Sequence, residues 1–287
     1  MNWGGNSAAC RGEVPCFERE GISVFCLKKE DMDEIAPVFD GWNETLIWSC
    51  LQGYMGNAWA DDIQNPKSAQ IITGDFCFFA GAPNVELVKN IPEGFPSKCI
   101  LMAVQNDEWG NLIEQEYKTN CQKFMRYAIK KECDIFDTEK LHSFIEKLPL
   151  EYSVRKIDEE IYKRIQQEKW SADLCSQFPT YKDFEKYGLG FVALHHDQLV
   201  SGASSYTVYD KGIEIEIDTI VDYRRKGLAL VCASKLILEC LDRGLYPSWD
   251  AANRASVALA EKLGYHFEKE YATYAITNFK EDRYEGK

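Results

Sequence analysis

Residues 213–231, IEIEIDTIVDYRRKGLALV, join an alternating apolar stretch to a continuous apolar stretch through three cations and a glycine. The alternation predicts a β-strand over 213–221, and the apolar run predicts a helix over 227–244. The first backbone N–H groups of a helix have no partner inside the helix, so this basic loop presents them to an anion. Gly227 lets the backbone approach a ligand closely. The segment therefore predicts a strand–loop–helix unit that holds a diphosphate.

Spacing excludes two familiar phosphate-binding loops. A Walker loop requires G-x-x-x-x-G-K-[ST] and a dinucleotide fold requires G-x-G-x-x-G, and this segment contains neither pattern. A basic turn that only solubilises the loop remains the alternative. An Arg or Gln followed by x-x-Gly-x-Gly or Ala occurs roughly 0.3 times by chance in a chain of this length. The short motif therefore needs support from the rest of the chain.

Charge and cysteine usage narrow the range of partners. The chain has 287 residues, a net charge of −13 and a pI near 4.9, so we expect no nucleic acid or anionic membrane as partner. Its eleven cysteines are odd in number and form no C-x-x-C pair, so we expect reduced, mostly buried thiols and no metal site. Neither a signal peptide nor an apolar run of about 18 residues is evident, which favours a cytoplasmic protein. A homodimer is compatible with the sequence.

Patterning divides the chain into three parts. Residues 1–21 lack periodicity and predict a loosely ordered extension, 22–150 mix helical and strand patterns and predict an N-terminal α/β domain, and 151–287 predict a second domain. We expect helices at 44–56, 158–167, 180–188, 227–244 and 253–265, strands at 70–81, 98–105, 121–130, 152–157, 213–221, 245–251 and 266–276, and a hairpin at 191–209. The fold class is α/β (α+β), and no internal repeat is apparent at the sequence level.

A second block of sequence follows the basic loop at a fixed distance. PSWDAANRASVALAEKLGY supplies a short strand, an Asn at a helix start, and a helix ending in Lys-Leu-Gly-Tyr. Together the two blocks resemble the GNAT family of acetyl-CoA-dependent N-acetyltransferases. The family's loop [Q/R]-x-x-G-x-[G/A] is matched by Arg224, Gly227 and Ala229, and its next strand and helix by 249–265. The resemblance covers 151–277, and the whole chain looks more narrowly like the two-domain subgroup that includes zwittermicin A resistance proteins.

The resemblance implies a fold and a cofactor site. The C-terminal domain would contain a mixed central sheet flanked by helices, and the strand before the basic loop would splay from its neighbour. That splay would leave backbone groups at Ile220 and Val221 free to pair with the pantetheine arm of acetyl-CoA. The remaining cofactor contacts that it implies are Arg224, Arg225, Lys226, Gly227, Leu228 and Ala229 at the pyrophosphate and Asn253 near the pantetheine. Asn253 also fits a simple helix N-cap.

Transfer to an amine requires a base, because an amine of pKa near 10 is mostly protonated at neutral pH. Glu214, Glu216 and Asp218 alternate with isoleucines, so a regular strand would place all three carboxylates on one face and raise their pKa values. We predict Glu216 as the base and Glu214 as the second choice, with Asp218 facing the substrate. A solvated strand face is the alternative. Backbone N–H groups of 219–221 would stabilise the oxyanion.

One family feature is absent. Many members place a Tyr seven residues after the Asn to protonate the departing thiolate, and this chain has Ala260 there. Tyr206, Tyr271 or Tyr274 are alternatives, and a thiol of pKa near 8.5 leaves without much help. Trp249 and Asp250, at the end of a strand, are further predicted substrate contacts.

The sequence therefore predicts an N-acetyltransferase that moves an acetyl group from acetyl-CoA to a primary amine of a small molecule by direct attack, without a metal. Two alternatives remain open: a non-catalytic acyl-CoA-binding or regulatory module, which the absent Tyr favours, and an interaction domain that binds a protein partner through its N-terminal part.

Overall fold

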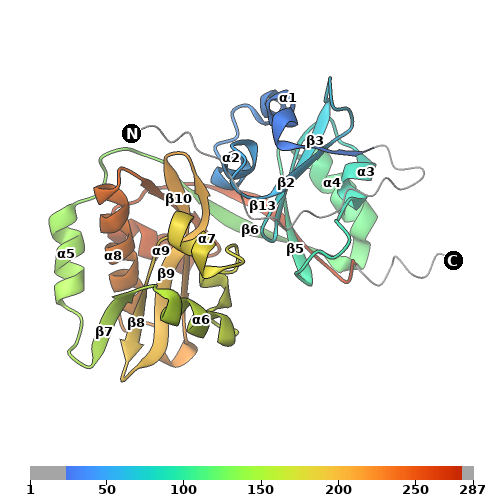
Figure 1. Cartoon of the computed structure of the whole chain (residues 1–287). Coiled ribbons are helices and arrows are strands. Elements are labelled where there is room, and N and C mark those ends of the chain that lie inside the picture. The colour runs from blue at the N-terminus through green and yellow to red at the C-terminus, as the bar shows by residue number, and fades with distance from the viewer. Residues whose placement is uncertain (1–23, 280–287) are drawn as a thin grey trace. The chain divides into compact units, whose positions relative to one another are not determined.

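The computed structural model describes residues 24–279, whose contacts divide into two compact units (Figure 1). Unit 1 comprises Met1–Arg126 and Tyr271–Lys287, and unit 2 comprises Tyr127–Glu270. This division differs from the predicted boundary near residue 150, because 127–150 pack within unit 2 and the chain from Tyr271 packs within unit 1. The predicted extension at 1–21 lies outside the described residues.

Unit 1 is built on six strands of an eight-stranded sheet, in the order β1-β2-β3-β4-β5-β13. Its strands are β1 (Phe25–Cys26), β2 (Asn57–Ala60), β3 (Ser68–Thr73), β4 (Phe76–Gly81), β5 (Cys99–Val104) and β13 (Phe267–Thr277), which begins in unit 2. Neighbouring strands are antiparallel except β4 and β5, which are parallel. The segment 70–81, which the alternation predicts as strand, folds as a hairpin because Gly74 adopts a positive φ between β3 and β4.

Short helices accompany this sheet. They are η1 (Lys29–Asp31), α1 (Met32–Ile35), η2 (Ala36–Phe39), α2 (Thr45–Leu51), α3 (Val85–Lys89), α4 (Asp107–Tyr117) and η3 (Lys118–Asn120). Trp109 of α4 is fully buried, stacks on Phe79 at 5.0 Å between ring centroids, and donates from Nε1 to Gly81 O at 3.0 Å. The core of unit 1 therefore closes over the end of β4.

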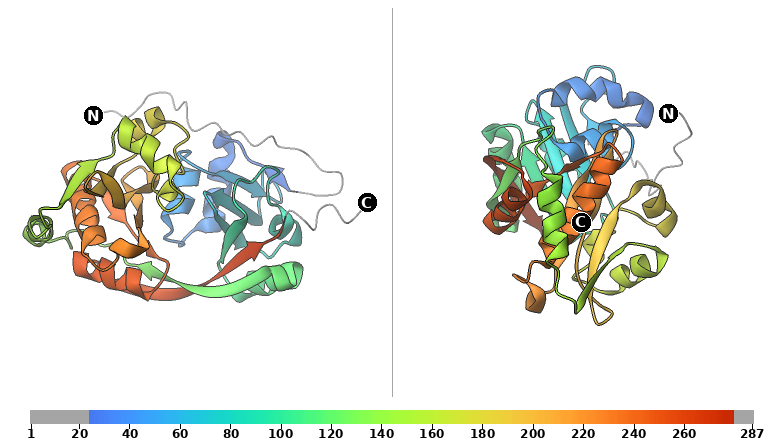
Figure 2. Two further views of the ribbon diagram at one scale, coloured as in Figure 1. Left: turned by 90° about the horizontal axis from the view of Figure 1, so that it is seen from below. Right: turned by 90° about the vertical axis from the view of Figure 1, so that its left-hand side faces the viewer.

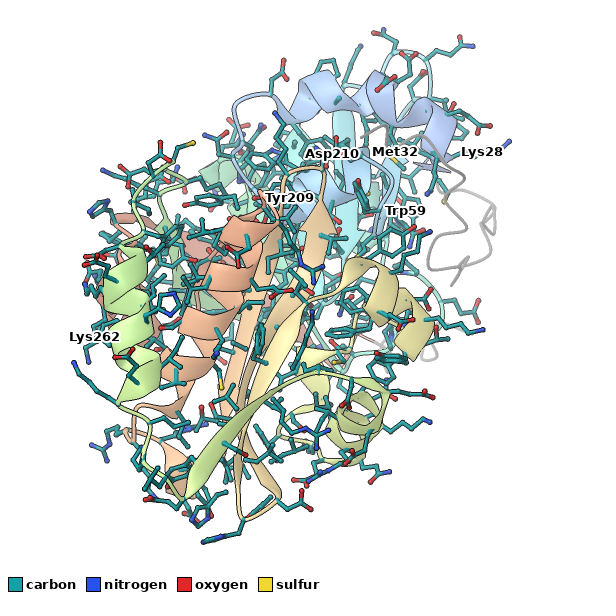
Figure 3. All side chains as sticks on the ribbon, turned by 60° about the vertical axis from the view of Figure 1, so that its left-hand side comes forward. Lys28, Met32, Trp59, Tyr209, Asp210 and Lys262 are labelled. Atoms are coloured by element: carbon teal, nitrogen blue, oxygen red, sulfur yellow. The ribbon has the colours of Figure 1, made fainter. Side chains whose placement is uncertain are left out.

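Unit 2 contains the predicted site segment. Its strands are β6 (Cys121–Ile129), which begins in unit 1, β7 (Tyr152–Lys156), β8 (Gly190–His195), β9 (Gln198–Tyr209), β10 (Gly212–Thr219), β11 (Tyr246–Ser248) and β12 (Asp250–Ala251). One sheet has the order β11-β10-β9-β8-β7, and β12 pairs with β6. Figure 3 labels Tyr209 and Asp210 at the turn between β9 and β10. These strands confirm the predicted α/β class with helices flanking a mixed sheet.

The helices of unit 2 cover both faces of its larger sheet. They are α5 (Thr138–Glu146), α6 (Glu159–Gln167), η4 (Ala172–Leu174), α7 (Tyr181–Tyr187), η5 (Val221–Tyr223), α8 (Leu228–Asp242) and α9 (Arg254–Leu263). On β9, Ser201 lies beside the thiol of Cys232 of α8, whereas a Cβ on Gly202 would lie 2.5 Å from Leu174 of η4. Because successive strand residues point to opposite faces, α8 and η4 lie on opposite sides. Figure 2 shows α8 alongside α5.

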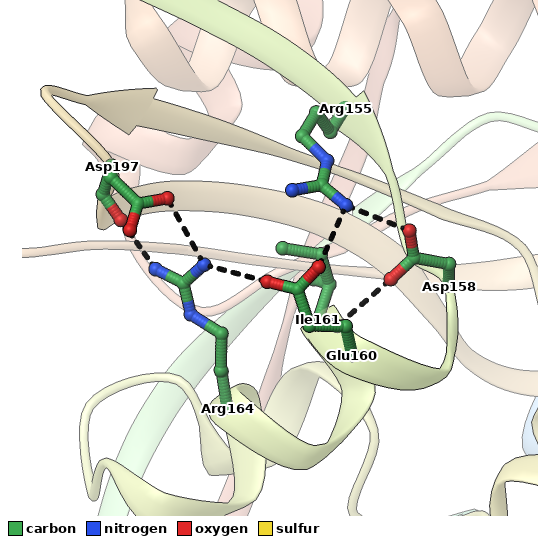
Figure 4. Close-up of polar contacts among 6 residues, drawn as sticks. All are labelled: Arg155, Asp158, Glu160, Ile161, Arg164 and Asp197. Carbon is green, nitrogen blue, oxygen red and sulfur yellow. Dashed lines mark hydrogen bonds and ion pairs between the residues drawn. The ribbon is translucent and has the colours of Figure 1, made fainter.

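The β8–β9 hairpin is held at its tip. His196 (φ +46°) and Asp197 (φ +72°) form the two-residue turn of the predicted hairpin. Arg164 of α6 donates to both the carboxylate and the carbonyl oxygen of Asp197, and Asp158 caps α6 by accepting from Ile161 N at 2.9 Å (Figure 4). These contacts fix the hairpin tip, which reaches the basic loop described below.

Three further findings concern the described residues alone. Every cysteine between residues 24 and 279 is a free thiol, and Cys50, Cys77, Cys175, Cys232 and Cys240 are buried. Within the same range, His, Cys, Asp and Glu side chains form no group of three arranged to hold a metal ion. No helix of the described chain combines the length and apolar character needed to cross a bilayer.

Candidate active site

Strand β10 loses its neighbour halfway along its length. It pairs in parallel with β11 only at Gly212, Ile213 and Glu214, after which β12 pairs with β6 instead. Within the described sheet, residues 215–219 therefore have no strand partner on that edge, although they pair with β9 on the other. The splay implied by the resemblance is present and lies just before the basic loop.

The backbone groups along this open edge come from alternate residues. Ile220 N donates to Val200 O of β9 at 3.0 Å, and Asp218 O accepts from Ser201 Oγ, so these residues turn toward β9. Alternation then directs Ile217 and Thr219 to the open edge. The expected pairing position at Ile220 is therefore displaced, because its N–H is bonded to β9 and its carbonyl accepts from Tyr223 N.

The same geometry limits the expected oxyanion donors. Thr219 N donates to Asp218 Oδ1 at 3.1 Å, and Ile220 N is already bonded to β9. Among residues 219–221, only Val221 N has no acceptor within the described part of the protein, and its side chain is 69% exposed. Pairing register decides this, and the sequence carries no signal for it.

The loop after β10 gathers backbone N–H groups. Arg225 (φ +61°) and Gly227 (φ +84°) both have left-handed backbone, which is typical of loops whose amides surround an anion. For the amides of 225–230, no protein acceptor exists among residues 24–279, and Val231 N is the first to donate, to Gly227 O at 3.1 Å. A Cβ on Gly227 would meet no atom within 4 Å. This helix start fits a diphosphate.

The cations of the loop differ in what they contact. Arg224 Nε donates to Thr219 O at 3.1 Å, so its guanidinium lies against the open edge of β10. Lys226 Nζ lies 4.5 Å from the ring centroid of Tyr223, and the Tyr223 hydroxyl is 2.9 Å from His195 Nδ1 at the hairpin tip. Arg225 is exposed, and the first turn of α8 has no acidic residue. The cations of the loop and the amides at the start of α8 therefore both favour a bound anion.

Sequence reasoning missed the anchoring role of Tyr223. Its hydroxyl and ring connect the loop to the β8–β9 hairpin and to Lys226. Tyr223 stands just before the cations in the sequence, but its partner His195 lies 28 residues away, so local pattern does not reveal the contact.

The carboxylates of β10 have different neighbours. The register of β9 and β10 shifts between Glu214 and Ile215, where Tyr206 is an extra residue on β9, so the alternation along β10 itself is kept. Asp218 pairs with Gly202 on the η4 side, where burial raises the pKa of its carboxyl and Asp173 adds to the rise, while Arg224 opposes it. The raised pKa of Asp218 therefore comes from burial, and not from crowding by its strand neighbours.

Glu214 occupies a different environment. It is 5% exposed and lies near three tyrosines, Tyr209, Tyr246 and Tyr265. Burial raises the pKa of each phenol, to about 12 for Tyr246, and the Glu214 carboxylate adds to each rise. Glu216 is half-buried, pairs with Ser204, and lies in the stretch of β10 that has no β11 partner.

The remaining predicted substrate and cofactor contacts are Trp249, Asp250 and Asn253. Trp249 is 5% exposed, donates from Nε1 to Ser256 Oγ at 3.0 Å, and packs edge-on against Tyr265. Asp250 is half-buried and pairs with Ala128 of β6. Asn253 caps α9 by accepting from Ser256 N at 3.0 Å, which confirms the N-cap and leaves a cofactor contact as a prediction.

The position of the absent general acid is buried. Ala260 lies inside α9 with no exposed surface. Of the alternatives, Tyr274 is buried in the core of unit 1, where its hydroxyl lies against Gly110. Tyr206 is 7% exposed and is the extra residue at the β9–β10 register shift, beside Glu214. Tyr271 is half-buried.

Comparison with known proteins identifies relatives across both units. A family model described as GNAT acetyltransferase matches residues 36–274. An uncharacterised N-acetyltransferase of Bacillus subtilis (strain 168), YdfB, is 28% identical over 259 residues, which cover 86% of this chain and 97% of the relative. These matches do not address the zwittermicin A resistance subgroup, which stays a prediction.

Solved structures of GNAT proteins are similar to this chain. A GCN5-related N-acetyltransferase-like protein from Streptococcus suis 89/1591 is 46% identical and superposes with a TM-score of 0.81 over 85% of this chain and 98% of its own. A tandem GNAT protein from the clavulanic acid biosynthesis pathway shares the fold at 9% identity, with a TM-score of 0.56 over 88% of this chain and 98% of its own. Because the family model spans most of both units, the chain belongs to the GNAT acetyltransferase family.

Proposed function

We propose that the protein transfers an acetyl group from acetyl-CoA to a primary amine of a small molecule. The observation that carries this proposal is the run of backbone N–H groups at 225–230, which has no acceptor in the described chain and follows the open edge of β10. A diphosphate at the loop would direct the pantetheine arm along that edge. The thioester would then lie beside residues 215–219.

The reaction needs few groups. The amine nitrogen attacks the thioester carbonyl carbon, an N–C bond forms, and the C–S bond breaks as the nitrogen loses a proton to a base. The CoA thiolate then takes a proton. We assign the base to Glu216, because it lies in the part of β10 that has lost β11, and keep Glu214 as second choice. Asp218 and Asp250 are proposed to face the cationic acceptor, since carboxylates attract an ammonium group.

A non-catalytic acyl-CoA-binding module is the alternative. It is favoured by Ala260, which is buried where many family members carry the Tyr that protonates the thiolate. Both functions require the same loop, so binding alone does not separate them.

Turnover separates the two functions. The protein is incubated with acetyl-CoA and a panel of primary amines, and CoA is measured by liquid chromatography, because exposed Cys133 would react with thiol reagents. The transferase proposal predicts amine-dependent CoA release with an acetylated product. Tight acetyl-CoA binding without release for any amine would support the binding module.

The base assignment has its own test. For an accepted amine, Glu216→Gln should lower kcat by about 10²-fold or more and remove the rise of rate with pH. Glu214→Gln is the matched control, since it makes the same change two residues away. A Glu216→Gln enzyme with wild-type rate and pH profile would contradict the assignment, and loss only in Glu214→Gln would transfer it to Glu214.

A further inference from the structure

The order of elements in the chain occurs twice. Leaving the 3₁₀ helices aside, residues 25–129 run β1, α1, α2, β2, β3, β4, α3, β5, α4, β6. After α5, residues 152–277 run β7, α6, α7, β8, β9, β10, α8, β11, α9, β13, with the short β12 following β11. The two sequences of elements are the same, although the amino-acid sequence shows no repeat.

Strand pairing repeats as well. The first four strands of each set form an antiparallel meander, β1 to β4 in one and β7 to β10 in the other. The fourth strand then pairs in parallel with the strand after the next helix, as β4 with β5 and β10 with β11. A parallel neighbour joined through a helix is a specific topology, so the agreement indicates two copies of one fold.

The last strands are exchanged. In unit 1, β5 pairs antiparallel with β13, which ends the second set. In unit 2, β12 pairs antiparallel with β6, which ends the first set. Each unit therefore includes part of the other set's final strand, and the unit boundaries fall inside β6, after Arg126, and inside β13, before Tyr271.

The segment of unit 1 that corresponds to the basic loop is built differently. It joins β4 to α3 through 82–84, which contain no cation. Here β5 stays paired with β4 as far as Phe79, two residues before β4 ends, so β4 has no long unpaired edge like that of β10. Gly81 N donates to Gln105 Oε1, and Gly81 O accepts from buried Trp109, which occupies the end of the strand.

The helix start in unit 1 is also satisfied internally. Ala82 N donates to Lys67 O at 2.9 Å, Pro83 has no N–H, and Asn84 Oδ1 accepts from the amides of Glu86 and Leu87. Glu86 occupies the second helical position, where α8 has Ala229. A carboxylate there repels a phosphate, and α3 is only 5 residues long against 15 for α8.

We infer that the chain is a fused pair of GNAT folds with exchanged last strands, in which only the second copy binds acetyl-CoA, so that each chain holds one cofactor molecule. The inference rests on the proposed function for its ligand. It extends that function by assigning the first copy a structural role, in which β5 pairs with β13.

Stoichiometry and paired variants test the inference. Titration calorimetry of the full chain with acetyl-CoA should give one site per chain. Ala229→Glu, which places in α8 the carboxylate that α3 already has, should weaken binding at least tenfold. Ala82→Glu makes the same change at an exposed position of the corresponding loop and should leave affinity and stoichiometry unchanged. Thermal unfolding checks each variant, and exposed Arg225→Glu replaces Ala229→Glu if that variant does not fold.

The outcomes separate this inference from the proposed function. Two sites per chain would overturn the inference and leave the transferase proposal standing. One site that is lost in Ala82→Glu and kept in Ala229→Glu would overturn both. No acetyl-CoA binding to the wild-type chain would overturn both. One site that is lost only in the unit 2 variants supports the inference.

Discussion

Replacing Gly227 separates the loop's need for a backbone conformation from its need for space. Gly227 has φ +84°, a value that residues with a Cβ adopt at a cost, yet a Cβ built there meets no atom within 4 Å. Gly227→Ala should therefore suffer backbone strain without a clash. Gly227→Asn should suffer less strain, because Asn tolerates the left-handed region.

The size of the effect follows from two opposing contributions. Left-handed backbone costs a residue with a Cβ about 1–2 kcal/mol. Ala also reduces the conformational entropy of the unfolded chain, which stabilises the folded protein by about 0.4–1 kcal/mol. Gly227→Ala should therefore lower the free energy of unfolding by about 1 kcal/mol, or Tm by about 2–4 °C. Either side chain fills the open space before the amides, so acetyl-CoA affinity should fall about tenfold, or about 1.4 kcal/mol.

Urea unfolding measures stability, and calorimetry measures acetyl-CoA affinity. Gly94→Ala is a matched control, because Gly94 has φ +79° and also has nothing within 4 Å of a Cβ. It should lose the same stability and keep wild-type affinity. Wild-type affinity in Gly227→Asn would refute the argument that the ligand uses the space at Gly227. A stability loss in Gly227→Ala well above that in Gly94→Ala would show that the loop is crowded.

Three further changes test other parts of the site. Burial raises the pKa of Asp218 above its ordinary 3.8, so the unfolding free energy of the wild type falls as pH rises through the folded-state pKa. Asp218→Asn should therefore gain stability over wild type from about pH 4 upward. Urea unfolding at several pH values measures this difference, and a difference that stays constant with pH would contradict the prediction. Tyr223→Phe removes the hydroxyl 2.9 Å from His195 and should weaken acetyl-CoA binding several-fold in calorimetry, whereas Tyr181→Phe should not. Trp249→Phe should lower the unfolding free energy by about 1–3 kcal/mol through the lost bond to Ser256, with KM for the amine unchanged; a raised KM at wild-type stability would instead support substrate contact.

Local pattern was enough for much of unit 2. The alternation of 213–221 predicted β10, the apolar run after Gly227 predicted α8, and Asn253 predicted the start of α9. Each of these signals depends on neighbours two to four residues apart in the chain, and such neighbours stay close in any fold that contains the element. For the same reason the sequence located the helix start whose amides face an anion.

Long-range pairing decided the rest. The strand predicted at 245–251 divides at Trp249 because its first part pairs with β10 and its second with β6, which is more than a hundred residues earlier. The same choice of partners opens the edge at 215–219, and β9 carries an extra residue, Tyr206, at the register shift beside Ile215. Neither event leaves a mark on the local pattern.

The division into units is the clearest case. The sequence by itself determined most elements of unit 2 and the basic loop, since both follow from residue spacing along the chain. Only the tertiary structure decided that β13 completes unit 1 and β6 contributes to unit 2, because a final strand presents the same alternation to either sheet. Which edge it joins depends on the packing available there, and that property belongs to the folded chain.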